Sequence, residues 1–442
     1  MRTQRSRWPP ILWNVVQEHL DEASFFWRQR ERTLRAPDHG LADLADGDER
    51  RLWAHLEGLR VGGPVVAERL LLPALEEGEG WERTAAAHVL LAADAARWGP
   101  RVLSCLEETP PQERAFLQQA LSLSAAAEVD DLLLTALPGA APGLQAALLE
   151  VLRLRRTDVT SVLGRLSLAE SPELLTAAIR AARHAPEAVV APLVSRGLDT
   201  EDARCQDAAI EVGLVRGHFA AAARCRTLIS EGKAGRAVLA FLAMSGDRRG
   251  VMHLLARMAD EGARAEVLWA LGLSGRSEAL EAVLRLILSD ADPLAAEAFR
   301  FVTGIPLDSY LEPPEDEDEA EASPAPDAEG VVSFLPEPTA PQGQVRADVI
   351  DRWWSEEQSR FPSGGRYVWG RRWTPEVALQ ALLEVPVTRR PALAWELAVR
   401  SGGACWVETG TWTWIQARQI REARRLRLDP GTRAFEVVLV SR

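Results

Sequence analysis

Histidine and carboxylate side chains at helical spacing are the first residues of this chain that could do chemistry. His19, Asp21, Glu22 and His55 are of the types that bind zinc. The pattern H-E-x-x-H, which places two histidines and a general base on one helix face, does not occur. Histidines and acids at helical spacing more often lie on a surface or cap a helix. We therefore predict no metal site and no cofactor.

Motifs for phosphate binding and nucleophilic catalysis are incomplete. Gly232-Lys233 resembles the end of a phosphate-binding loop, but Ala234 stands where serine or threonine is needed, and Thr227 where glycine is needed. Neither a G-x-S-x-G turn nor a G-x-G-x-x-G loop after a strand occurs. A triad assembled across the chain from its 7 dispersed histidines stays open as an alternative. We predict no catalytic residues and hence no enzymatic activity.

Tryptophan and arginine gather in residues 345–442. Of the 15 tryptophans of the chain, this region holds Trp353, Trp354, Trp369, Trp373, Trp395, Trp406, Trp412 and Trp414. Both residue types anchor protein interfaces, because each combines a large contact area with a polar group. The residues that we predict to contact a partner protein are Arg371, Arg372, Trp373, Arg389 and Arg390. For Trp353, Trp369 and Trp395 we favour the alternative, a place in the core of a small domain.

The elements that must position these residues are repeated helices. A unit of about thirty residues recurs from Glu82 to Gly304, as in an α-solenoid. Large apolar residues at the centre of one helix in each unit mark the period, at Leu148, Ile179, Ile210, Leu239, Leu268 and Phe299. The predicted fold class is all-α: a HEAT-like helical-repeat solenoid with an N-terminal helical cap and a small, mostly helical C-terminal domain.

Helix boundaries within the solenoid follow from capping signals. Helix pairs are expected at Arg83–Glu107, Pro111–Leu137, Gly143–Leu166, Pro172–Arg196, Glu201–Ile229, Gly232–Met258 and Gly262–Leu288, with a last helix at Pro293–Thr303. Ser171 and Asp292 each precede a proline and suit the N-cap. The glycines that suit a left-handed C-cap are Gly217, Gly246, Gly275 and Gly304.

The concave face of a solenoid usually binds its partner. We expect the second helix of each pair to form it here. Its arginines are Arg165, Arg196, Arg224, Arg226, Arg248, Arg249, Arg257 and Arg285. Because each unit also carries acids and no long basic stripe emerges, we favour a solvated face of mixed charge over a nucleic-acid groove.

Four regions are predicted. Residues 8–82 form the helical cap, with helices at Ile11–Arg35, Gly47–Leu59 and Val65–Leu75. Residues 83–305 form the solenoid. Residues 306–344 form an acidic, proline-rich flexible linker, in which only Val331–Pro336 is apolar enough to dock on a neighbouring surface.

Residues 345–442 form the Trp/Arg-rich C-terminal domain. Its expected helices are at 346–361, at 374–385 with Thr374 as N-cap, at 389–403 and at 415–428, and extended pieces are expected at 364–373 and 405–414. An acidic binding role for the linker stays open as an alternative.

Composition limits the class of protein. With 442 residues, 47% hydrophobic and 26% charged, the chain is globular and long enough for more than one unit. Much of the net charge of −13 lies at Glu312, Glu315, Asp316, Glu317, Asp318, Glu319, Glu321, Asp327 and Glu329. The 4 cysteines form no C-x-x-C pair, and neither a signal peptide nor a transmembrane stretch is recognisable. We expect a cytoplasmic protein that does not bind a membrane.

Several segments carry a resemblance to a known family. Ile11–Leu34, His55–Leu75, Ala295–Leu307 and Val349–Val385 together resemble an uncharacterised family of proteobacterial HEAT-like repeat proteins. Members are often encoded near components of type VI secretion. The resemblance implies an effector adaptor, a chaperone or an immunity factor, and no functional residue carries over. The tail from Asp429 to Arg442 departs from the family pattern.

Two functions of different class follow. The first is a non-catalytic protein–protein interaction scaffold, whose partner would be a secretion effector or a structural component. The alternative is a HEAT-like nucleic-acid-binding protein or a DNA glycosylase-like enzyme. Because the chain is acidic and shows no basic stripe, we favour the scaffold and do not expect nucleic acid as the partner.

Overall fold

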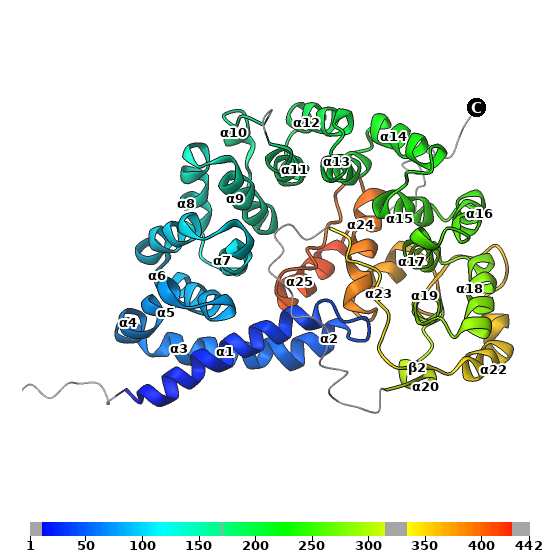
Figure 1. The fold of residues 1–442 in the computed structure, drawn as a ribbon, viewed down its shortest axis with the longest axis horizontal. Helices are drawn as coiled ribbons and strands as arrows, with labels where there is room; N and C mark the ends of the chain where they lie inside the picture. Colours follow the sequence, from blue (N-terminus) through cyan, green and yellow to red (C-terminus); the bar gives the residue numbers. More distant parts are fainter. Residues whose placement is uncertain (1–10, 169–170, 314–333, 427–442) are drawn as a thin grey trace, which may run out of the picture.

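The structure is a computed structural model that describes residues 11–168, 171–313 and 334–426. Helix follows helix around a ring, and the last helices of the chain lie in its middle (Figure 1). The all-α fold class and the helical-repeat solenoid are confirmed. Within the described ranges, no helix is long and apolar enough to cross a lipid bilayer.

The N-terminal cap begins with the long helix α1 (Trp13–Thr33). Its buried residues, Val16, Leu20, Ala23 and Trp27, recur at helical spacing and form the stripe that faces the next helices. The other elements of the cap are α2 (Leu41–Leu44), a π-helical turn at Ala45–Glu49, α3 (Arg50–Val61), α4 (Gly63–Val66) and α5 (Leu72–Glu77). The three helices predicted for the cap, at Ile11–Arg35, Gly47–Leu59 and Val65–Leu75, are present. Residues 1–10 lie outside the described ranges.

The first repeats are irregular. Helix α6 (Gly80–Glu108) changes direction at Asp94, whose backbone is not helical, so that its two halves act as a helix pair. The elements that follow are α7 (Arg114–Leu123), α8 (Glu128–Ala136), α9 (Pro142–Arg155) and α10 (Thr160–Leu163). Terminal repeats of a solenoid lack one neighbour and are often atypical.

The later repeats are regular pairs. They comprise α11 (Pro172–Ala181) with α12 (Glu187–Asp199), α13 (Ala203–Val215) with α14 (Phe219–Ser230), α15 (Arg236–Met244) with α16 (Arg248–Arg257), α17 (Arg264–Ser274) with α18 (Ser277–Asp290), and the single helix α19 (Pro293–Thr303). Ser171 and Asp292 accept hydrogen bonds from backbone N–H groups of the helices that they cap, as predicted. Every predicted pair is present.

The predicted C-cap glycines all adopt the left-handed conformation. The φ angles of Gly217, Gly246, Gly275 and Gly304 are 74°, 63°, 62° and 71°. At Gly275 the requirement for glycine is double. A Cβ atom there would lie 2.2 Å from the carbonyl oxygen of Tyr367, which belongs to a segment that crosses the end of α17.

The concave face is built from the first helix of each pair, not from the second as predicted. Helices α9, α11, α13, α15, α17 and α19 form the inner wall of the ring, and α12, α14, α16 and α18 lie outside (Figure 1). The first helices are also the more apolar, because they are covered on both sides. In α15, for example, every residue from Ala237 to Met244 is buried.

Within residues 334–426, here called the C-terminal segment, the part from Pro375 to Ala423 lies inside the ring, whereas Ala347–Glu357 pack beside the outer helix α18 (Figure 1). The elements of the segment are β2 (Gln344–Val345), α22 (Ala347–Glu357), β3 (Tyr367–Val368), β4 (Arg371–Arg372), α23 (Pro375–Ala381), α24 (Arg390–Arg400) and α25 (Thr413–Ala423). Helix α24 contacts α13 and α15, and α22 contacts α18. The segment shares one continuous core with the later repeats, whereas we predicted a separate C-terminal domain.

The predicted extended pieces fare differently. Residues 364–373 form the β3–β4 hairpin, which turns at Trp369 and Gly370, both with positive φ. Residues 405–412 form an irregular loop without a strand partner, so the predicted extended piece there is wrong. The three tryptophans of this stretch are buried to different degrees: Trp412 is buried, Trp406 is half-buried and Trp414 is exposed. The tail from Asp429 lies outside the described ranges.

The predicted linker is ordered where the structure describes it. Helix α20 (Leu307–Tyr310) and strand β1 (Leu311–Glu312) follow the last repeat, and β1 pairs with β2. Phe334 and Leu335 dock into the ring, where Leu335 is buried, as predicted for Val331–Pro336. Residues 314–333, which hold most of the acids, lie outside the described ranges.

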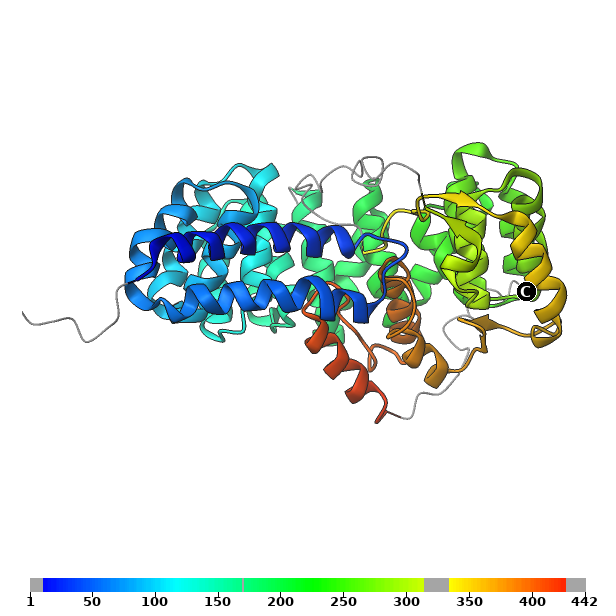
Figure 2. The same cartoon turned by 90° about the horizontal axis from the view of Figure 1, so that it is seen from below.

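The N-terminal cap closes the ring. Arg300 of α19 donates a hydrogen bond to the carbonyl oxygen of Pro37 at 3.2 Å, and Val387 N–H donates to that of His39 at 2.8 Å. In the second view the helices α1 and α3 run across the front of one half of the ring, and α25 projects to one side of it (Figure 2). The chain therefore joins its beginning, its last repeat and its C-terminal segment.

Candidate functional site

The strongest candidate for a functional site is the C-terminal segment together with the concave face that holds it. The face offers charged side chains from the inner helices, and the segment offers their partners.

Glu408 is the most heavily paired acid of the segment. Its carboxylate forms an ion pair with Arg183, and the guanidinium groups of Arg153 and Arg156 lie 3.8 and 3.7 Å away. Its side chain is only 4% exposed, so these charges compensate one another in the interior. Burial lowers the pKa of Arg183 to about 10 even though Glu408 opposes the shift. The carboxylate fixes the loop before α25 to α9 and to the end of α11.

Arg389 and Glu297 form a second buried pair. Arg389 Nε lies 2.8 Å from Glu297 Oε1, and Arg389 Nη1 donates to the carbonyl oxygen of Trp269 at 2.6 Å. The guanidinium also lies over the rings of Trp269 and Phe301. These contacts attach the start of α24 to α17 and α19.

Glu396 of α24 is buried and binds two arginines. Arg366 and Arg400 both pair with its carboxylate, and their guanidinium groups lie 4.8 and 4.4 Å from the ring centre of Trp373. Burial opposes the charge of Glu396, but the two arginines outweigh it and hold the pKa of Glu396 below its usual value. Arg366 also donates to the carbonyl oxygens of Leu273 and Ser274.

Two buried tryptophans anchor the segment to different halves of the ring. Trp395 Nε1 donates to the carbonyl oxygen of Glu211 at 3.2 Å, and the Trp395 ring packs edge-on against Phe334. Trp412 Nε1 donates to the carbonyl oxygen of Leu123 at 2.9 Å. Trp412 also lies among Trp27, Trp53 and His88 of the cap and first repeat.

The predicted core tryptophans lie as expected to different degrees. Trp395 is 2% exposed and belongs to the core. Trp353 and Trp369 are half-buried and pack against the same core. The predicted place in the core is therefore confirmed for Trp395, whereas Trp353 and Trp369 lie at the edge of the core.

The structure does not bring the five predicted partner-binding residues together. Arg389 and Arg390 are fully buried, which contradicts a direct contact with a partner. Arg390 Nε donates to the carbonyl oxygen of Leu382 at 2.7 Å, and burial lowers the pKa of Arg390 to about 9. The prediction of a partner contact is wrong for both arginines. The sequence does not show that Arg389 pairs with Glu297, or that backbone carbonyl groups accept hydrogen bonds from both guanidinium groups. Arg371, Arg372 and Trp373 lie nearer the surface.

Arg371 is connected by hydrogen bonds to a basic surface at α25, which the sequence analysis did not predict. Its guanidinium pairs with Glu384 at 2.7 Å, Gln380 donates to the same carboxylate, and Arg424 beyond α25 donates to Gln380. This chain of hydrogen bonds places β4, α23 and the end of α25 on one surface. Figure 2 shows α23 and α25 on the side where the segment projects from the ring.

The outward side of α25 carries the exposed residues of this surface. We call Trp414, Arg418, Arg421 and Arg425 the α25 ridge; all are exposed. Trp414, Arg418 and Arg421 follow one another at i, i+4 and i+7, which is the spacing of one helix face, and Arg425 lies in the turn after the end of α25 at Ala423. The same spacing is visible in the sequence, where it would have indicated the ridge once the helix was predicted.

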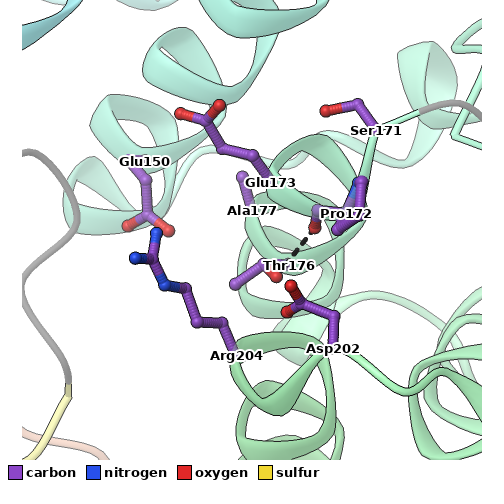
Figure 3. A pocket seen from close by; sticks show the side chains of 8 residues that line it. All are labelled: Glu150, Ser171, Pro172, Glu173, Thr176, Ala177, Asp202 and Arg204. Carbon is purple, nitrogen blue, oxygen red and sulfur yellow. Dashed lines mark hydrogen bonds between the residues drawn. The ribbon is translucent and has the colours of Figure 1, made fainter.

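A cavity of about 330 Å³ lies beside the inner wall, outside the C-terminal segment (Figure 3). It is lined by Glu150, Ser171, Pro172, Glu173, Thr176, Ala177, Asp202 and Arg204. Ser171 and Asp202 serve as N-caps of α11 and α13, and Glu150 pairs with Arg153 at 2.7 Å. In Figure 3 the guanidinium of Arg204 points toward Glu150. Ser171, Asp202 and one carboxylate oxygen of Glu150 thus have structural partners, whereas Glu150 Oε1 is buried and accepts no hydrogen bond from the described residues. No histidine lines the cavity.

A wider hollow of about 620 Å³ lies at the cap. Asp38, His39, Ala42, Asp43, Asp46, Gly47 and Asp48 line it. The hydrogen bond from His39 to Asp38, at 2.8 Å, raises the pKa of His39. Elsewhere in the cap, His19 Nδ1 and His55 Nδ1 lie 3.1 Å apart. Among the described residues, no group of three or more His, Cys, Asp or Glu side chains could hold a metal ion.

Comparison with known proteins adds little to this geometry. No family model matches the chain, and no curated protein matches it. Among solved structures, human deoxyhypusine hydroxylase in complex with glycerol shows 18% sequence identity over 68% of this chain and 98% of that chain, with a TM-score of 0.20. A likeness at that TM-score carries no argument about function. The relation to the proteobacterial family stays a prediction.

Proposed function

We propose that the protein is a non-catalytic protein–protein interaction scaffold that binds its partner on the outer surface around β4, α23 and α25. The observation that carries the proposal is the α25 ridge, where the indole of Trp414 is 48% exposed beside arginines. Tryptophan and arginine are the types most often found at the centre of protein interfaces. Arg371, which the sequence analysis selected for partner binding, is connected to the same surface through Glu384 and Gln380.

The filled concave face supports an outer binding surface. Trp395, Arg389 and Glu408 are buried against the inner helices, so a partner would have to expel them to reach that face. Removing a single large aromatic side chain from a core costs about 3–5 kcal/mol, and the whole segment contributes many such contacts. A rigid ring with an exposed ridge offers a partner a preorganised surface instead.

The family resemblance indicates which partner to seek. It implies an adaptor, a chaperone or an immunity factor linked to type VI secretion, with an effector or a structural component of that system as the partner. The alternative, a DNA glycosylase-like enzyme, would need a concave face open to DNA. Because the C-terminal segment fills this face, we do not propose it.

The test is purification of the tagged full-length protein from its native cells. The lysate is treated with nuclease and washed at about 0.1 M salt, where contacts between charged groups survive. We expect one protein to remain bound in near-stoichiometric amount and the variant Trp414→Ala to capture less of it. Retention of nucleic acid without any protein would overturn the proposal.

A further inference from the structure

The α25 ridge is a row of exposed side chains on a firmly held helix and on the turn that follows it. Thr413, at the start of α25, donates two hydrogen bonds to Glu49 Oε2, from its backbone N–H at 2.9 Å and from its hydroxyl at 2.6 Å. Ile420 and Ala423 are buried on the opposite side of the helix. The ridge therefore faces away from the ring and keeps its geometry in the free protein.

Within the part of the chain that the structure describes, the charges of the ridge are largely uncompensated. Arg421 and Arg425 form no ion pair with the residues that the structure describes. The carboxylate nearest to Arg418 is that of Glu422, at 3.9 Å, and its guanidinium lies over the ring of Trp414 at 5.8 Å. Neighbouring like charges repel, so an anionic ligand would relieve the repulsion between these arginines.

Two observations favour a protein over a nucleic acid as that ligand. The net charge of the chain is −13, which repels a polyanion at long range and leaves only short-range attraction at the ridge. Trp414, at the start of the ridge, and Leu426, next to Arg425 beyond the helix, are 48% and 42% exposed and offer apolar contacts. From Trp414 to Arg421 the helix rises by about 10.5 Å, the length of two turns of a partner helix, and Arg425 follows in the turn after α25.

We propose that the α25 ridge binds an acidic segment of the partner protein, an inference that rests on the proposed function. Carboxylates of that segment pair with Arg418, Arg421 and Arg425, and an apolar side chain covers Trp414. Acidic residues at i, i+3 or i+4 and i+7 of a helix would match the spacing of the three arginines. Charge pairs of this kind set the association rate and the choice of partner.

The first test is charge reversal on the ridge. The variant Arg418→Glu, Arg421→Glu, Arg425→Glu is compared with a control that reverses exposed arginines elsewhere, Arg248→Glu, Arg249→Glu, Arg352→Glu. Both change the net charge equally, and thermal unfolding checks that both fold. We expect the ridge variant to capture less than about one tenth of the partner bound by the wild type, and the control to capture as much as the wild type.

The second test identifies the chemistry of the contact. A photo-crosslinking benzoylphenylalanine replaces Trp414, and mass spectrometry identifies the partner peptide joined to it. We expect a peptide rich in Asp and Glu. A peptide without acidic residues, or a crosslink to nucleic acid, would overturn the inference.

The possible outcomes separate the two proposals. The acidic-segment inference is wrong if the partner binds the ridge variant and the control equally well, or if it binds neither of them. The scaffold function stands in both cases. If the wild type itself captures no protein, the scaffold function fails and the inference falls with it.

Discussion

Arg389 and Glu297 are 92 residues apart in the chain and meet as an ion pair in the middle of the ring. Neither side chain is more than 2% exposed. The pair joins the start of α24 to the last repeat, at the point where Arg300 also contacts the cap. The repeats, the cap and the C-terminal segment thus depend on one another.

Replacing Arg389 by methionine should strongly destabilise the protein. The substitution leaves the carboxylate of Glu297 buried without a partner, and breaking a buried pair in this way costs about 3–5 kcal/mol. The free energy of unfolding in urea measures the loss. Arg372→Met is the control, because Arg372 is exposed and such changes stay within about 0.5 kcal/mol.

The double variant Glu297→Leu, Arg389→Met separates charge from packing. With both charges removed, no unpaired charge remains, and we expect most of the lost free energy of unfolding to return. A double variant no more stable than Arg389→Met alone would show that the burial of charge is not the cause.

Gly275→Ala should cost more than Gly232→Ala, although both glycines have positive φ. An alanine Cβ at position 275 would meet the carbonyl oxygen of Tyr367 at 2.2 Å, whereas nothing lies within 4 Å at position 232. We expect about 1 kcal/mol for Gly232→Ala from backbone strain alone, and about 2 kcal/mol more for Gly275→Ala. Equal losses in urea unfolding would mean that the hairpin containing Tyr367 does not rest on α17.

Truncation of two tryptophans of the C-terminal segment should change the free energy of unfolding by very different amounts. Trp395→Ala empties a site between α13, α15 and α24 and should cost about 3–5 kcal/mol in the free energy of unfolding. Trp414→Ala removes an exposed ring and should stay within about 0.5 kcal/mol. The measurement on Trp414→Ala also establishes whether this ridge variant folds. A small loss for Trp395→Ala would contradict its place in the core.

His88 should make the protein sensitive to acid. Burial lowers the pKa of His88 to about 4, whereas an unfolded histidine titrates near 6.5. Between these values the unfolded state binds one more proton, so the free energy of unfolding falls as the pH falls. Relative to His88→Leu, the wild type should lose about 2 kcal/mol between pH 6.5 and pH 5. Parallel pH profiles for the two proteins would contradict a neutral, buried His88.

Local features of the fold could be predicted from the sequence, because local signals determine them. The period of Leu148, Ile179 and Ile210 gave the repeats, Gly275 gave a helix end, and Thr374 capped α23 as expected. These signals depend on residues within one or two helical turns. They also sufficed to predict α22, α24 and α25.

The position of the C-terminal segment could not be predicted in this way. Its contacts join residues far apart in the chain, such as Arg183 with Glu408 and Trp412 with Leu123. A charged residue such as Arg389 is expected at the surface as long as its distant partner is not known. The concave face was likewise assigned to the wrong helices, because local patterns do not show which helix of each pair lies inside the ring.

The most direct test of this account is native-state hydrogen exchange of the free protein. The central claim is that the C-terminal segment fills the concave face without any partner present. The amides of α24 should then exchange only through global unfolding, with the same free energy of opening as those of α13 and α15. Exchange of α24 at a clearly lower free energy, while α13 stays protected, would show that the segment leaves the face and would contradict the account.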